Sequence, residues 1–152
     1  MPIVSNSSPL IALEQIERLD LIHALFGEIL IPDAVAVEIA PTVQARSWIR
    51  QRSLSLPLPP ETLRPALGSG ERAAISLAVE TNASAIILDD EPARKVAAQL
   101  KIPIIGTGGV LLLAKDRQLI AAVKPCLDAL ISHRFFLGRA MYELLLSRAG
   151  EL

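Results

Sequence analysis

Short apolar runs alternate along the chain with longer segments in which apolar residues recur every three or four positions. The runs are rich in β-branched residues and predict buried strands at residues 2–5, 28–32, 85–89 and 102–106. The periodic segments predict helices at 6–16, 18–26, 33–40, 72–80 and 91–100, from 107 onward, and twice more between 123 and 149. Strands that alternate with helices indicate a parallel sheet with right-handed crossovers and helices on both faces.

Two segments in the first half of the chain depart from this alternation. Residues 42–52 predict a basic amphipathic helix with Arg46 and Arg50 one turn apart. It either contacts nucleic-acid phosphates or is a solvated helix with Trp48 against the core. Residues 53–67 are rich in proline and predict an extended connection. No repeat or low-complexity stretch divides the chain, so we expect residues 1–152 to form a single domain.

Three carboxylates follow the apolar run at 85–88. They are Asp89, Asp90 and Glu91, and the first two cannot both face the core because successive strand residues point opposite ways. Ligands of open α/β sheets bind outside the carboxyl ends of the strands, which makes these acids functional candidates. The alternative is that Asp89 or Asp90 only caps the helix predicted at 91–100, whose first turn contains Pro92.

Other polar residues occupy equivalent places. Asn6 ends the first predicted strand, and Glu71 lies in the first turn of a helix preceded by Gly68 and Gly70, which let the backbone approach another group closely. For Glu71 the alternative role is a favourable interaction with the helix dipole. Glu38 lies on the rim of an apolar helix face, and its spacing alone favours a surface position.

Side-chain oxygens without histidine or cysteine predict a hard divalent cation, Mg²⁺ or Mn²⁺. Several adjacent carboxylates repel one another unless a cation or a raised pKa relieves the repulsion. Such ions activate water and stabilise the oxygens of a phosphodiester displacement. The glycines around Thr107 weakly indicate phosphate binding at a helix N-terminus. Neither His23 nor His133 lies in a strand-end motif, which disfavours nucleophilic catalysis and suits structural roles.

Composition limits the possible partners. The single cysteine, Cys126, excludes a disulfide framework and a cysteine-based zinc site. The net charge of −1 gives no broad attraction for nucleic acid, so RNA or DNA would need a local patch and bound cations. The mean hydropathy of +0.44 indicates a buried subunit or partner interface. No apolar run approaches the ~20 residues of a membrane span and no export signal is evident, so we expect a cytoplasmic protein.

Four ordered motifs carry a resemblance to a known family. They are Val-Ser-Asn-Ser-Ser-Pro-Leu-Ile at 4–11, Gly-x-Gly-Glu at 68–71, Leu-Asp-Asp followed by Ala-Arg at 88–94, and Ile-Gly-Thr-x-Gly-Val-Leu at 105–111. Together they resemble a branch of the PIN domains, the fold of VapC-type toxin ribonucleases. The resemblance implies a three-layer α/β/α sandwich with a mostly parallel central sheet and a Mg²⁺- or Mn²⁺-dependent nuclease. It also implies an RNA substrate, a small antitoxin protein as partner, and a homodimer.

The resemblance assigns roles residue by residue. The four acidic positions of the family fall on Asn6, Glu38, Glu71 and Asp90, with Asp89 adjacent, and this replaces the surface interpretation of Glu38. We expect all five to hold the cation and all but Asp89 to be catalytic. The small polar positions fall on Ser7, Ser8 and Thr107, which with Arg46 and Arg50 form the expected substrate-binding set.

Asn6 departs from the family pattern and leaves alternatives open. An amide oxygen can ligate a cation but adds no negative charge, so metal affinity should fall; Asp89 could compensate. The leading hypothesis is a metal-dependent ribonuclease toxin of a toxin–antitoxin pair. The first alternative is a catalytically weakened PIN-like module that binds nucleic acid or protein. A receiver-type or phosphatase-like protein would need a nucleophilic aspartate where this chain has Asn6.

Overall fold

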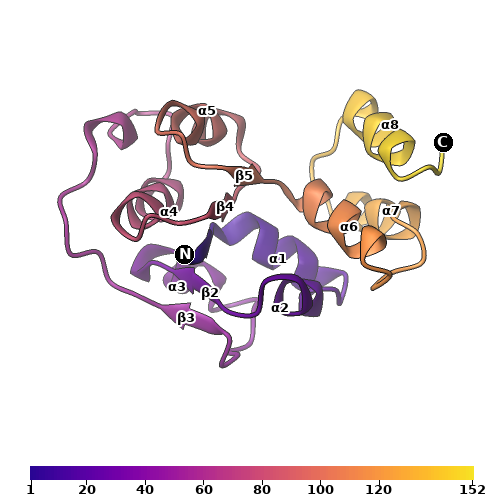
Figure 1. Cartoon of the computed structure of the whole chain (residues 1–152), viewed down its shortest axis with the longest axis horizontal. Coiled ribbons are helices and arrows are strands. Elements are labelled where there is room, and N and C mark those ends of the chain that lie inside the picture. The colour runs from indigo at the N-terminus through magenta and orange to yellow at the C-terminus, as the bar shows by residue number, and fades with distance from the viewer.

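Five short parallel strands form the central sheet of the computed structural model, which describes residues 1–152 (Figure 1). The strands are β1 (Ile3–Ser5), β2 (Ile29–Ile31), β3 (Ile49–Gln51), β4 (Ala85–Ile87) and β5 (Ile104–Ile105). Their order is β3-β2-β1-β4-β5, with Val4 opposite both Leu30 and Ile86, and Ile86 opposite Ile104. Because every pair is parallel, the carboxyl ends of all five strands lie along one edge.

Eight α-helices flank the sheet, which confirms the predicted three-layer α/β/α sandwich. They are α1 (Ser7–Gln15), α2 (Asp20–Phe26), α3 (Asp33–Ile39), α4 (Ser69–Glu80), α5 (Glu91–Gln99), α6 (Thr107–Asp116), α7 (Lys124–Ser132) and α8 (Arg139–Arg148), with a short 3₁₀ turn, η1, at Pro60–Thr62. Helix α3 packs against both α1 and α4. Helices α7 and α8 lie beyond α6, on the side of the molecule away from α4 (Figure 1).

The core is aliphatic and surrounds the central strands. Val4, Ile86, Ile87 and Leu88 are fully buried, and each such side chain stabilises the fold by about 1.5–3 kcal/mol. Helix α4 buries most of the face that the sequence predicts, but Val79 is 41% exposed. No helix of the structure is long and apolar enough to cross a membrane.

The basic helix predicted over residues 42–52 is wrong. Residues 41–48 form turns and loop, and β3 follows, with Ile49 opposite Ile29 of β2. The backbone N–H of Ile29 donates to the carbonyl of Trp48 at 2.9 Å, so the segment forms hydrogen bonds across the sheet instead of within a helix. The helical spacing of Arg46 and Arg50 therefore has no structural meaning, because pairing with a distant strand overrides local periodicity.

Two aromatic rings near this segment have structural roles. Trp48 is buried, as expected, and its ring stacks on that of His23 with 5.0 Å between centroids. The Nδ1 atom of His23 lies 2.9 Å from the carbonyl oxygen of Gly27, whose φ of 75° ends α2.

Strands β4 and β5 are shorter than predicted, and the C-terminal part contains the two predicted helices with Gly138 between them.

Candidate functional site

The carboxyl ends of β1 and β4 form the switch point of the sheet. Strand β1 has β2 on one side and β4 on the other, and the chain places Asn6 directly after β1 and Asp89 just after β4. The backbone N–H of Asn6 donates to the carbonyl of Ile87 at 3.0 Å, which joins the two strand ends. Ligands of open α/β sheets bind in the crevice at such a point.

Asn6 carries a buried acceptor with no partner. The residue is 2% exposed, and its Oδ1 is the one buried side-chain oxygen or nitrogen in the structure that lacks a hydrogen bond. Asn6 stands at the N-cap of α1 without making a side-chain cap bond. An unsatisfied buried acceptor costs about 1–3 kcal/mol, so this oxygen favours a donor or a cation from outside the chain.

The residue after Asn6 connects α1 to α3. The Oγ of Ser7 donates to Oε1 of Glu38, which brings this carboxylate to the start of α1. Although Glu38 is exposed as a residue, its head group is held by a buried serine. The structure thus places the Glu38 carboxylate at the start of α1, and its role in a site stays a prediction.

The glycines before Glu71 leave room for two carboxylates. A Cβ at Gly70 would overlap Oε1 of Glu38, and a Cβ at Gly68 would lie 2.8 Å from Oε2 of Glu71. Both contacts are tighter than ordinary van der Waals packing. The backbone approach that the sequence predicts at these glycines is therefore an approach to the protein's own acids, and it brings both carboxylates to the first turn of α4.

Asp89 is held by the start of α6. The backbone N–H and Oγ1 of Thr107 donate to its two carboxylate oxygens at 2.8 and 2.6 Å. Burial raises the pKa of the Asp89 carboxyl above its usual range, although the bonds from Thr107 and the charge of Arg94 oppose the rise. Thr107 is fully buried. The protein's own carboxylate thus already accepts the N–H of Thr107 at this helix N-terminus, and phosphate binding there stays a prediction.

Asp90 takes the capping role considered from the sequence. Its Oδ2 accepts the backbone N–H of Ala93 at 3.1 Å, so the residue is the N-cap of α5. Asp89 binds Thr107 instead, as the opposite directions of successive residues predict. The cap uses one oxygen of Asp90.

The predicted site residues therefore fall into groups that differ in their surroundings. Ser7 and Glu38 meet at the start of α1, directly after Asn6 in the chain, with Glu71 at the same helix turn as Gly70; Asp89 and Thr107 meet at the start of α6. Nowhere do three or more aspartate, glutamate, histidine or cysteine side chains lie close enough to hold a metal ion.

The remaining substrate-binding candidates are less well placed. Ser8 is exposed on α1. Arg46 forms an ion pair with Glu14 at 2.8 Å, and Arg50 lies 3.5 Å from Glu28. Their charges are thus shared with carboxylates of other segments, and their role in RNA binding stays a prediction.

The residues present still match the chemistry of a divalent cation. The candidate metal ligands at this edge are all oxygen atoms, the type of ligand that Mg²⁺ and Mn²⁺ prefer. The orphaned Oδ1 of Asn6 and the glycine that makes room for the Glu38 carboxylate supply an acceptor and space. The spacing of Gly68 and Gly70 before Glu71 predicts a close approach there. Arg94, which donates to the carbonyl of Leu88 at 3.4 Å, belongs to a sequence motif but has no predicted role.

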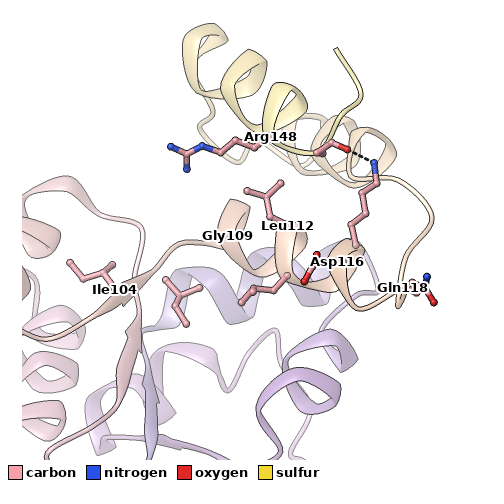
Figure 2. A pocket seen from close by; sticks show the side chains of 10 residues that line it. Ile104, Gly109, Leu112, Asp116, Gln118 and Arg148 are labelled. Atoms are coloured by element: carbon pink, nitrogen blue, oxygen red, sulfur yellow. Dashed lines mark hydrogen bonds between the residues drawn. The ribbon is translucent and has the colours of Figure 1, made fainter.

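A pocket of about 710 Å³ lies elsewhere, between β5, α6 and α8 (Figure 2). Its wall is largely apolar and includes Ile104, Leu112 and Arg148, and it contains none of the predicted site residues. Size alone does not make it the site, because the acids and the orphaned amide lie at the carboxyl ends of the strands.

The parallel sheet, its flanking helices and the polar carboxyl edge are those of a PIN domain. The chain belongs to the PIN-domain family DUF3368, whose model matches residues 2–151, so the predicted membership of the PIN domains is confirmed. PIN domains have a nuclease fold, generally use divalent metal ions and generally bind nucleic acid. No curated protein and no solved structure matches the chain.

Proposed function

We propose that this PIN domain is a metal-dependent ribonuclease in which Glu38, Glu71 and Asp90 hold Mg²⁺ or Mn²⁺, with Asn6 and Asp89 assisting. The observation that carries the proposal is the orphaned Oδ1 of Asn6, buried at the switch point of the sheet. A buried amide oxygen without a donor is a natural cation ligand, and the next residue, Ser7, orients the Glu38 carboxylate at the start of α1. When bound, the cation supplies water activation and charge stabilisation at phosphorus.

The chain's own residues contribute orientation and charge. Ser7 fixes Glu38, and Thr107 fixes both oxygens of Asp89, so neither carboxylate rotates freely. Asp89 has a raised pKa because of burial, which suits it to hold a proton on a carboxylate oxygen more readily than an exposed aspartate does. Asn6 contributes an oxygen without charge, so we expect weak cation affinity compared with an aspartate at that position.

The biological setting of the proposal is a toxin–antitoxin pair. Hydrolysis of cellular RNA would make the protein toxic, and a small antitoxin protein would bind and neutralise it. We also infer a homodimer. Both partners would need apolar contact area, and Phe136, Met141 and Leu144 near the C-terminus are exposed. Survival of cells that express the chain with and without its neighbouring gene measures the toxicity.

Cleavage of labelled RNA by the purified protein tests the activity. The assay compares Mn²⁺, Mg²⁺ and EDTA for the wild type, Glu71→Gln and Asp90→Asn. Asparagine is as good an N-cap as aspartate, so Asp90→Asn keeps α5 intact while it removes a charge. Glu143→Gln, in an exposed ion pair on α8, is the matched control. No cleavage with either ion, or full activity of Asp90→Asn, would refute the proposal.

A second candidate is a non-catalytic binding module. Two observations favour it: Asn6 brings no charge, and no three acidic, histidine or cysteine side chains gather at one point. In that case RNA would bind equally well with and without EDTA, and Glu71→Gln would bind like the wild type. RNA affinity that falls with either change would exclude this candidate.

A further inference from the structure

Arg94 extends from α5 across the carboxyl ends of β4 and β5. The side chain is half-buried, and its Nη1 donates to the carbonyl of Leu88 at 3.4 Å. A Cβ at Gly106 would lie 2.8 Å from the same Nη1, so glycine at this position leaves the space that the guanidinium fills. Arg94 thus lies between the end of β4 and the start of α6, at the edge that carries the candidate site.

Most of the donors of this guanidinium are free. It has five N–H groups, and the long bond to Leu88 is the one hydrogen bond that it makes. None of the ion pairs of the structure includes Arg94. By contrast, Arg72 donates to the carbonyls of Thr62, Arg64 and Leu67 and serves the fold.

Asp89 does not form an ion pair with Arg94. The charge of Arg94 acts on Asp89, but both oxygens of this carboxylate accept hydrogen bonds from Thr107. Asp90 uses one oxygen to cap α5. A half-buried cation with free, forked donors therefore remains at an edge where the other charged candidates are acids.

We propose that Arg94 binds a backbone phosphate of the nucleic-acid substrate. Arginine matches phosphate geometry with two parallel N–H bonds, and its charge would offset the repulsion between a phosphodiester and the surrounding carboxylates. The inference rests on the proposed function, since it assumes that this edge receives a nucleic acid. It assigns Arg94 to substrate binding, a role that the family positions considered above leave open.

RNA binding without divalent ions separates this role from cleavage. The assay is the fluorescence anisotropy of a labelled single-stranded RNA in EDTA at several salt concentrations, with the full chain. We expect Arg94→Gln to weaken binding about tenfold and to lower the slope of log K against log salt by about 0.7, one phosphate contact. Arg94→Lys should bind the RNA more weakly than the wild type but keep its salt slope, because the positive charge remains. Arg139→Gln removes an exposed charge on α8 and leaves affinity and slope unchanged.

Gly106→Ala provides a second variant with the charge retained. The added methyl group would lie 2.8 Å from Nη1 of Arg94 and 3.1 Å from Oδ1 of Asp89. It displaces the guanidinium at the closer contact, so RNA affinity in EDTA should fall as in Arg94→Gln although the net charge is the same. This variant and Arg94→Lys decide the question if Arg94→Gln does not fold. Loss of affinity in both supports the proposal, and wild-type affinity in both overturns it.

Two further outcomes would overturn the proposal. If Arg94→Gln lowers the melting temperature and leaves RNA affinity and salt slope unchanged, Arg94 only ties α5 to β5. If the wild type binds no RNA in EDTA, Arg94 has no phosphate to bind. The cleavage assay with Mn²⁺ tests the nuclease separately, so cleavage by a wild type whose binding is insensitive to Arg94 would refute this inference alone.

Discussion

Glu151 fastens the C-terminal end of the chain to the start of α7. Its carboxylate accepts the backbone N–H groups of Val123 and Lys124 at 2.7 and 2.9 Å and the Nζ of Lys115 at 2.9 Å. The hydrogen bonds from the two backbone N–H groups are the main cause that lowers the pKa of Glu151 from 4.5 to about 2, and Lys115 is a further cause. We predict that Glu151→Gln destabilises the protein.

The magnitude follows from the pKa. The lowering of the pKa from 4.5 to about 2, at about 1.4 kcal/mol for each pH unit, sets an upper limit of about 3.5 kcal/mol. Solvent beside Glu151 screens the charge of its carboxylate, and the glutamine of the variant retains one acceptor oxygen. We therefore expect Glu151→Gln to lower the free energy of unfolding by about 1–2 kcal/mol at pH 7. Glu143→Gln, whose ion pair with Arg139 is exposed, should change it by less than about 0.5 kcal/mol.

Urea unfolding followed by circular dichroism from pH 7 downward measures the effect. The folded-state pKa of Glu151 is depressed, so its stabilisation is present above pH 4.5 and is lost as the pH falls toward about 2. The difference between wild type and Glu151→Gln should narrow over that interval. Equal stability at pH 7, a difference that does not change with pH, or an equal loss in Glu143→Gln would refute the reasoning.

Three other predictions concern the candidate site. Asn6→Asp places an unpartnered charge at a 2% exposed position, so it should lower the melting temperature in EDTA and gain more from Mn²⁺ than wild type; an equal Mn²⁺ shift would contradict this. Gly70→Ala should displace the Glu38 carboxylate and weaken Mn²⁺ binding, as measured by calorimetry. In a Glu38→Ala background, where nothing is displaced, the same substitution should stabilise the protein by about 0.5–1 kcal/mol, and destabilisation there would argue against the contact between Gly70 and Glu38. Burial raises the pKa of Asp89, so the wild type should lose stability relative to Asp89→Asn as the pH rises above 3.8. If urea titrations show instead that the free energy of unfolding of the wild type increases relative to that of Asp89→Asn over this range, the prediction is wrong.

The sequence by itself determined the alternating architecture and the strand ends at which the candidate residues lie. Strands such as β4 are recognisable because a fully buried strand must be continuously apolar, and the turn at Asp90 is marked by a capping residue before Pro92. Once the sheet is parallel, its carboxyl ends share an edge, so Asn6 and Asp89 had to lie at the same edge of the sheet. These features depend on short-range patterns and on a topology rule, both of which a single sequence contains.

The tertiary structure alone decided what each polar group binds. Residues 49–51 became a strand because Ile49 meets Ile29, and Asp89 binds Thr107, which lies in the next helix. The orphaned Oδ1 of Asn6 and the contact of Glu38 with Gly70 likewise depend on how separate segments pack. Local spacing carries no information on contacts between distant segments, because backbone pairing and close packing select them only when the chain has folded.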